Sequence, residues 1–165
     1  MKKPKLSFSQ FLDYFPEVAL PISLTDESSR DFSRHNDPLP QPVIDRFIRP
    51  LEQDWDELTE VVPCFRIPDT YGFYAIIYWR ADLMRYQYVI ATFTKEGELI
   101  GRQVIAGTIS DGDTLVNSVA VIEEDWEILV LTGKTSAEGA ARYEARSSMT
   151  TKLELLPDGR IVNLQ

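Results

Sequence analysis

From residue 61 onward the chain alternates between strand-type runs and very short connections, and this pattern limits its fold more than any other feature. Aromatic and β-branched residues dominate the runs, and turn residues such as "KEGE", "EED" and "PDGR" join them. A parallel neighbour needs a crossover of about a dozen residues or more, so strands joined this closely must run antiparallel. The sequence therefore predicts an antiparallel β-meander, either curved or barrel-like. Its expected strands cover roughly residues 61–67, 72–81, 85–94, 98–106, 115–123, 126–133, 142–156 and 160–164, with "SDGD" at 110–113 as a turn inside a longer connection.

The first 60 residues predict short helices and loops that pack on this sheet. Residues 26–42 are polar and contain three prolines, which predicts a loop, and a helix is expected from Pro42 with an interruption at Pro50. The expected class is therefore α+β, mainly β, in a single domain of residues 1–165. An earlier short helix is expected after a capping serine at position 7 or 9, because four residues share one helical face: Phe8, Phe11, Leu12 and Phe15.

Two neighbouring expected strands, 72–81 and 85–94, carry four tyrosines among other aromatic residues. Both faces of the first strand are largely apolar, as in a strand covered on both sides. The rings either pack beneath the N-terminal helices or line a concave pocket with an arginine at its mouth for an anionic group. Packing is favoured, since aromatic stripes usually pack. The pocket interpretation assigns ligand binding to Tyr74, Tyr78, Tyr86, Tyr88, Arg80 and Arg102.

The charge and the cysteine content exclude several classes of function. A formal net charge of −9 disfavours binding to nucleic acid or to an anionic membrane, and no apolar window is long enough to span a membrane. The single cysteine, Cys64, excludes an intrachain disulfide and a multi-cysteine zinc site, and its apolar neighbours predict a buried side chain. The chain as written is expected to be cytoplasmic, or exported if a signal segment has been removed from it.

No constellation in the sequence predicts catalysis, a metal site or a cofactor. The only histidine, His35, lies in the proline-rich stretch and is expected to be exposed. The "TGKTSAEG" segment at 132–139 lacks the first glycine of a phosphate-binding loop, and neither G-x-S-x-G nor H-E-x-x-H occurs. The many carboxylates are expected to lie in solvated turns.

Residues 11–24, "FLDYFPEVALPISL", resemble the F-L-x-x-F-P-x-x-x-L-P opening of small, uncharacterised bacterial proteins. In those proteins antiparallel strands follow, with turns similar to "KEGELI" and "PDGRIV". Such relatives are often exported or lipid-anchored, but this chain lacks the lipobox cysteine. The resemblance implies no activity. It rests on Phe11, Leu12, Phe15, Pro16, Leu20 and Pro21.

The function is predicted as that of a non-catalytic binding or protein-interaction module that engages a protein partner. Such a module needs an exposed apolar patch or an open strand edge. A small-molecule carrier that uses a tyrosine-rich concave face is the alternative, and it needs a cavity. A carboxylate-dependent hydrolase comes third and needs carboxylates that converge in a cleft.

Overall fold

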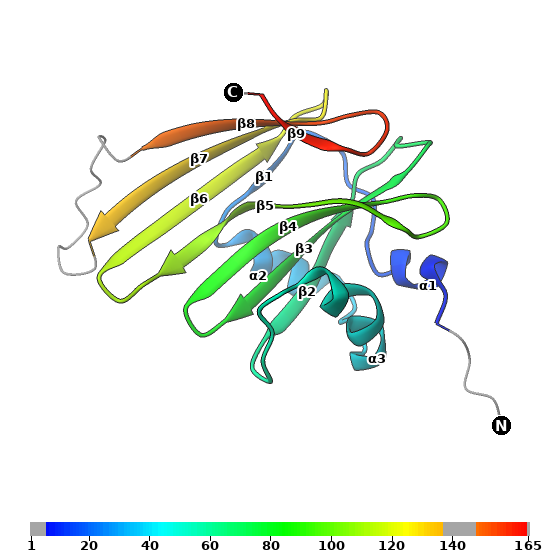
Figure 1. Cartoon of the computed structure of the whole chain (residues 1–165), viewed down its shortest axis with the longest axis horizontal. Helices are drawn as coiled ribbons and strands as arrows, with labels where there is room; N and C mark the ends of the chain where they lie inside the picture. The colour runs from blue at the N-terminus through cyan, green and yellow to red at the C-terminus, as the bar shows by residue number, and fades with distance from the viewer. Residues whose placement is uncertain (1–5, 137–147, 165) are drawn as a thin grey trace.

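The computed structural model describes residues 6–136 and 148–164, and it contains an antiparallel meander that coils into a curved sheet without closing into a barrel (Figure 1). The strands from β2 to β9 are neighbours in the same order as in the sequence, which confirms the predicted meander. Part of one expected strand, residues 142–147, lies outside the described residues. The strands are β1 (Ile22–Leu24), β2 (Glu60–Arg66), β3 (Tyr74–Asp82), β4 (Arg85–Phe93), β5 (Leu99–Ser110), β6 (Thr114–Ile122), β7 (Glu127–Ser136), β8 (Met149–Leu155) and β9 (Ile161–Asn163).

Short helices pack on the sheet, as predicted, but one of them replaces an expected loop. The polar, proline-rich composition of residues 26–42 predicts a loop, and α2 (Ser28–His35) shows that this prediction is wrong over eight residues. Tertiary contacts explain the difference. The Phe32 ring lies 5.6 Å from the Phe65 ring, and the Asn36 side chain, just after the helix, donates to two carbonyl oxygens of β2. These partners are distant in the sequence, so the composition of residues 26–42 does not indicate them.

The other helical segments agree better with the sequence. α1 (Phe8–Leu12) begins with a capping box in which Ser7 Oγ accepts the N–H of Gln10, and Gln10 Oε1 accepts the N–H of Ser7. None of the described helices is long and apolar enough to cross a membrane. The helix expected from Pro42 appears as three successive turns, with Pro50 in the last: α3 (Gln41–Val43), the π-helical segment η1 (Ile44–Ile48) and the 3-10 segment η2 (Arg49–Leu51).

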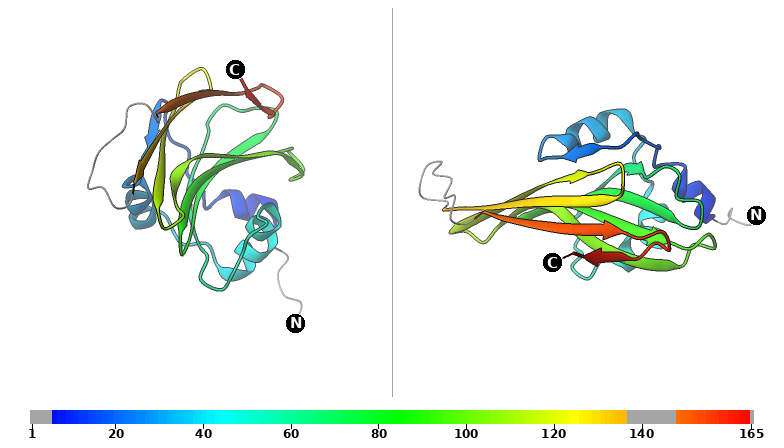
Figure 2. Two further views of the ribbon diagram at one scale, coloured as in Figure 1. Left: turned by 60° about the vertical axis from the view of Figure 1, so that its left-hand side comes forward. Right: turned by 90° about the horizontal axis from the view of Figure 1, so that it is seen from above.

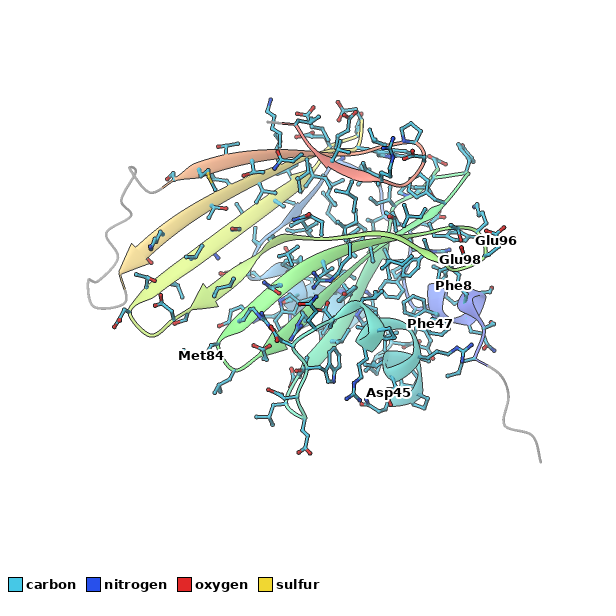
Figure 3. All side chains as sticks on the ribbon, viewed as in Figure 1. Phe8, Asp45, Phe47, Met84, Glu96 and Glu98 are labelled. Atoms are coloured by element: carbon cyan, nitrogen blue, oxygen red, sulfur yellow. The ribbon has the colours of Figure 1, made fainter. Side chains whose placement is uncertain are left out.

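The hairpin of β3 and β4 lies between two hydrophobic cores. On one face, α1, α3 and η1 pack against the sheet, with the rings of Phe8 and Phe47 side by side (Figure 3). On the other face, α2 and the inner face of β6 to β9 enclose a second core. Figure 2 shows α1 and α3 on one side of this hairpin and α2 on the other. Coverage on both sides explains why these two strands are apolar on both faces.

The sheet divides at β5, its longest strand. β5 pairs with β4 over its whole length, but it pairs with β6 only from Gly107 to Ser110. Beyond that point β1 takes the place beside β6. Residues 111–113 alone join β5 to β6, so the longer connection expected there is wrong. Within the described residues, 99–106 therefore have a strand partner only on the β4 side, and we call their other side the open edge of β5.

A bulge and a glycine produce this division. Val104 and Ala106 have partners in β4, but Ile105 between them has none, and such a bulge increases the local twist of a strand. The backbone of Gly107 has a φ of +141°, and a Cβ built there would lie 2.1 Å from the carbonyl oxygen of Tyr86. Only glycine fits this close approach, so the direction in which β5 leaves β6 is set by these neighbouring features.

The hairpin of β8 and β9 returns towards the open edge of β5. Its turn is held by Thr92 of β4, whose hydroxyl donates to the carbonyl oxygen of Gly159 at 2.6 Å. Gly159 has a φ of +91°, and its Cβ position already faces the Ile100 side chain. The last strand therefore lies across from β5 and leaves a space between the two parts of the sheet.

Candidate functional site

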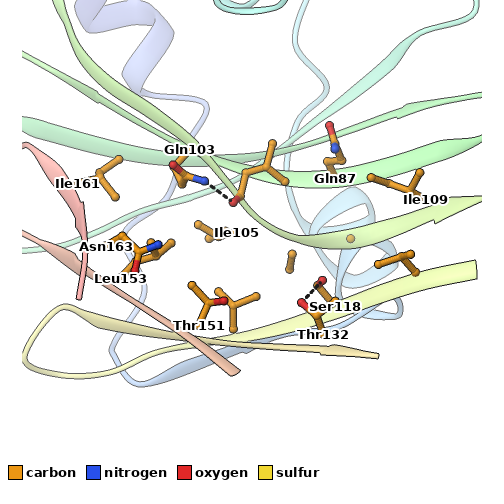
Figure 4. Close-up of a pocket in the computed structure, with 15 residues that line it drawn as sticks. Gln87, Gln103, Ile105, Ile109, Ser118, Thr132, Thr151, Leu153, Ile161 and Asn163 are labelled. Carbon is orange, nitrogen blue, oxygen red and sulfur yellow. Dashed lines mark hydrogen bonds between the residues drawn. The ribbon is translucent and has the colours of Figure 1, made fainter. Parts of the chain in front are cut away.

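A cleft of about 410 Å³ lies where the sheet divides (Figure 4). One wall of the cleft contains five consecutive residues of β5, from Gln103 to Gly107. Neighbouring side chains of a strand point to opposite faces, so a consecutive run can line a cleft only where the cleft meets the edge of the strand. The main-chain N–H and C=O groups of the open edge therefore face this cleft.

The opposite wall is formed by one face of β6 to β9. Each of these strands contributes two residues that are two positions apart, which places both on the same face. The strand register groups them into successive levels along the sheet, about 6.7 Å apart. The residues of this wall are Val116 and Ser118 of β6, Val130 and Thr132 of β7, Thr151 and Leu153 of β8, and Ile161 and Asn163 of β9.

None of the described residues that line the cleft is charged, although the chain has a net charge of −9. Aliphatic side chains alternate there with amides and hydroxyls. The hydroxyl oxygens of Ser118 and Thr132 lie 2.7 Å apart, and the Gln103 amide donates to the carbonyl oxygen of Val104 at 3.2 Å. These groups suit a ligand that is uncharged and forms hydrogen bonds.

Gln87 of β4 also lines the cleft, and the residue is 9% exposed. Its amide forms no hydrogen bond within the described residues, but it is not among the buried side-chain groups that lack a partner. The amide therefore keeps contact with water, and a polar ligand in the cleft can take the place of that water.

Three of the residues predicted to bind a ligand come together elsewhere, on the carboxylate of Glu52. Tyr78 Oη donates to Glu52 Oε1, Arg80 Nη1 lies 2.6 Å from Oε2, and Arg102 Nη2 lies 2.8 Å from Oε2. The side chains of Glu52 and Arg80 are each 2% exposed. We call these four residues the Glu52 cluster. The anionic group that the two arginines hold is therefore a side chain of the same protein.

The electrostatics of the Glu52 cluster favour a structural role. Burial would raise the pKa of the Glu52 carboxyl, but hydrogen bonds from Tyr78, Arg102 and Arg80 bring this pKa below its ordinary value. Burial, followed by the charge of Glu52, raises the pKa of the Tyr78 hydroxyl far above its usual range, so this group stays a donor. Arg80 also donates to the main chain at Asp54. The cluster thus fastens the segment after η2 to the sheet.

The strand register separates the remaining predicted tyrosines. Trp79 pairs with Tyr88, so Tyr86 and Tyr88 lie on one face of the hairpin, while Tyr74 and Tyr78 lie on the other. Tyr88 is 1% exposed and lies in the core beside α2, whereas Tyr86 is 42% exposed and stacks on Trp79. Tyr74 packs partly beneath α1. None of the six predicted residues lines the cleft, and their ligand-binding role stays a prediction.

The histidine, the cysteine and the carboxylates of the described residues do not form a second candidate site. His35 is exposed, and it lines a surface pocket of about 590 Å³ with Asp13 and Asp37. Among the described residues, no three His, Cys, Asp or Glu side chains are grouped so that they could hold a metal ion. Cys64 is buried, and burial raises the pKa of its thiol well above the usual range, so it remains protonated.

Reasoning from the sequence missed the cleft, although β6 and β7 contain a signal of it. Their inward face is aliphatic at Ile122, Ile128 and Val130, and it changes to hydroxyl side chains at Ser118 and Thr132. A polar change within a buried stripe indicates a part of the core that meets water or a ligand. The wall formed by β5 could not be found in this way, because its position depends on where β5 separates from β6.

Comparison with known proteins adds no functional information: no protein-family model, no curated protein and no solved structure matches this chain. The resemblance of residues 11–24 to small bacterial proteins therefore stays a prediction. The candidate site is defined by its own geometry, namely an open strand edge beside a cleft whose described lining residues are uncharged.

Proposed function

We propose that the protein is a non-catalytic binding module whose ligand binds in the cleft beside the open edge of β5. The open edge of β5 carries this proposal, because residues 99–106 have no strand partner on that side within the described residues and five consecutive residues, 103–107, line the cleft. A ligand with its own donors and acceptors can pair with the main-chain groups of this edge. The uncharged lining favours a ligand that is neutral where it enters the cleft, since an unpaired buried charge is costly.

The chemistry of the lining favours binding over catalysis. General acid–base catalysis needs a titratable group within reach of the substrate, and a serine or threonine nucleophile needs a neighbouring base. The described lining of the cleft contains amide, hydroxyl and aliphatic side chains. Ser118 and Thr132 contact each other. The carboxylate of Glu52, by contrast, is occupied by three donors of its own cluster.

A small-molecule carrier is the second candidate, and the size of the cleft supports it. The volume of about 410 Å³ falls within the ~300–1,000 Å³ of typical small-molecule sites. In this form of the proposal the ligand lies against Gln87, Gln103 and the wall of β6 to β9, and not among the tyrosines of the β3–β4 hairpin. Both candidates share one site and differ in the class of ligand.

The proposal is tested by mapping the binding of small uncharged amides, such as N-methylacetamide and larger diamides, by NMR on ¹⁵N-labelled protein. The backbone signals of Gln87, Gln103 and Ser118 are expected to shift together on titration. Thr151→Trp fills the cleft and is expected to abolish these shifts.

The control for this experiment is Thr150→Trp. Thr150 is exposed and lies next to Thr151 in β8, and its side chain points to the opposite face of the strand. It should therefore leave the shifts unchanged. Shifts that survive Thr151→Trp, or that map to a different part of the surface, would show that the cleft is not the binding site.

A further inference from the structure

We infer that the ligand of this cleft is a short, extended segment of another polypeptide, which adds to the open edge of β5 as a strand. This inference rests on the proposed function, because it names the class of ligand that occupies the same site. Strand addition provides main-chain hydrogen bonds along the edge and places alternate side chains against the neighbouring wall. The two walls of the cleft supply these two kinds of contact separately.

The first wall provides the main-chain contacts. Between residues 99 and 106, β5 pairs with β4 on one side and has no strand on the other side within the described residues. Consecutive residues from Gln103 to Gly107 line the cleft, so this edge is exposed inside it. The side chain of Gln103 now donates to the Val104 carbonyl oxygen. The main-chain N–H of an added strand would donate to this same carbonyl oxygen. Because the Gln103 side chain is exposed, such a strand can displace it easily.

The second wall has the repeat of an extended peptide. Its successive levels, such as Ser118–Thr132 and then Val130–Thr151, are about 6.7 Å apart. Side chains on one face of an extended peptide have the same spacing. A segment paired with β5 therefore presents its alternate side chains to these levels in register. Hydroxyl and aliphatic positions in this wall favour small aliphatic, hydroxyl or amide side chains, with no charge among them.

The position of the open edge also favours a single peptide segment as the binding partner, and disfavours the sheet edge of another folded protein. An edge at the outside of a protein can pair with the edge of another copy. Here the face of β6 to β9 stands opposite the edge, and a cleft of about 410 Å³ has no room for a complete strand pair with its side chains. A peptide group has both a donor and an acceptor, so an extended peptide can pair with the main-chain groups of the open edge.

The inference is tested with a displayed library of uncharged peptides of about six residues, a length that spans roughly 20 Å when extended. Peptides selected on the wild-type protein are expected to bind Thr150→Trp equally well and Thr151→Trp at least tenfold more weakly. Gln103→Glu provides a second blocking variant. Gln103 is exposed, so the change should not impair folding, and it places a charge at the open edge.

Methylation of main-chain nitrogen atoms separates strand addition from other modes of binding. In a strand, N–H groups of alternate residues point to the same neighbour. N-methylation of one alternate set in a selected peptide should weaken binding about tenfold or more, since each lost contact removes a hydrogen bond. Methylation of the intervening set should have a smaller effect. Equal effects of both sets would overturn strand addition.

The two proposals fail in distinguishable ways. If uncharged amides shift the cleft signals but no library peptide discriminates Thr150→Trp from Thr151→Trp, the peptide inference is refuted and the binding module stands. If selected peptides form dimers of the protein at the outer edge of β2 or β9, the site is wrong. If neither amides nor peptides depend on Thr151, both proposals are refuted.

Discussion

The substitution Glu52→Gln is expected to destabilise the fold strongly, although it changes one oxygen to a nitrogen. In the folded protein, Glu52 balances Arg80, which is 2% exposed, and Arg102, which is 28% exposed. Glutamine keeps one acceptor oxygen but removes the negative charge. Among the described residues, Asp82, at 2.8 Å, is then the one carboxylate that still forms an ion pair with the buried Arg80.

The size of the effect follows from these exposures. Breaking a buried ion pair by removing one partner costs ~3–5 kcal/mol, because the other charge is left without compensation. The glutamine oxygen and Asp82 offset part of this cost, and Arg102 can turn towards water. We therefore expect Glu52→Gln to lower the free energy of unfolding by about 2–4 kcal/mol. Glu57→Gln is the matched control in the same segment, where the side chain is exposed, and it should change the free energy by less than about 0.5 kcal/mol.

The measurement is equilibrium unfolding in urea followed by tryptophan fluorescence. Trp55 reports on the cluster directly, because the guanidinium carbon of Arg80 lies 5.8 Å from the centre of its ring. A loss below about 1 kcal/mol for Glu52→Gln, or a loss equal to that of Glu57→Gln, would refute the view that this carboxylate compensates buried charge.

Three further predictions concern stability. Hydrogen bonding holds the pKa of Glu52 below its ordinary value of 4.5. The contribution of Glu52 to the free energy of unfolding is therefore fully present above pH 4.5 and is lost as the pH falls through the lower pKa of the folded state. The difference in unfolding free energy between wild type and Glu52→Gln should accordingly shrink below pH 4.5 and stay constant above it. Gly107→Ala should cost at least ~2 kcal/mol in urea unfolding, because the added Cβ meets a carbonyl oxygen in a backbone conformation that favours glycine, whereas Gly72→Ala, where a Cβ meets open space, should cost clearly less. Ser7→Ala should lower the thermal midpoint by an amount equivalent to about 0.5–1 kcal/mol, and an unchanged midpoint would mean that the capping box contributes nothing.

The meander was predictable because its information is local. The turns around Gly97 and Gly159 have positive φ values of +91° each, as their turn residues indicate, and short turns leave no alternative to antiparallel pairing. The helical spacing of the N-terminal aromatic residues was local in the same sense. The helix at α2 was not, because Phe32 is stabilised by Phe65, a contact between residues far apart in the sequence.

The candidate site was harder to predict for the same physical reason. The division of the sheet depends on the bulge at Ile105 and on the pairing register beyond Gly107, which the composition of β5 does not specify. Glu52 looks like one of many surface carboxylates in the sequence, yet its partners lie 26, 28 and 50 positions away. Of the six residues predicted to bind a ligand, three contact the Glu52 carboxylate, and the ligand-binding role of the set stays a prediction.

Hydrogen exchange of the β5 amides, followed by NMR, tests most directly whether this strand has an open edge that faces the cleft. Between the irregularities at Ile100 and Ile105, in residues 101–104, every second amide should be protected by its bond to β4, and the intervening amides should exchange quickly. From Gly107 to Ser110, where β6 closes the edge, protection should extend to both sets. Uniform protection from 99 to 110 in the unliganded protein would contradict the open edge, and with it the binding site proposed for this protein.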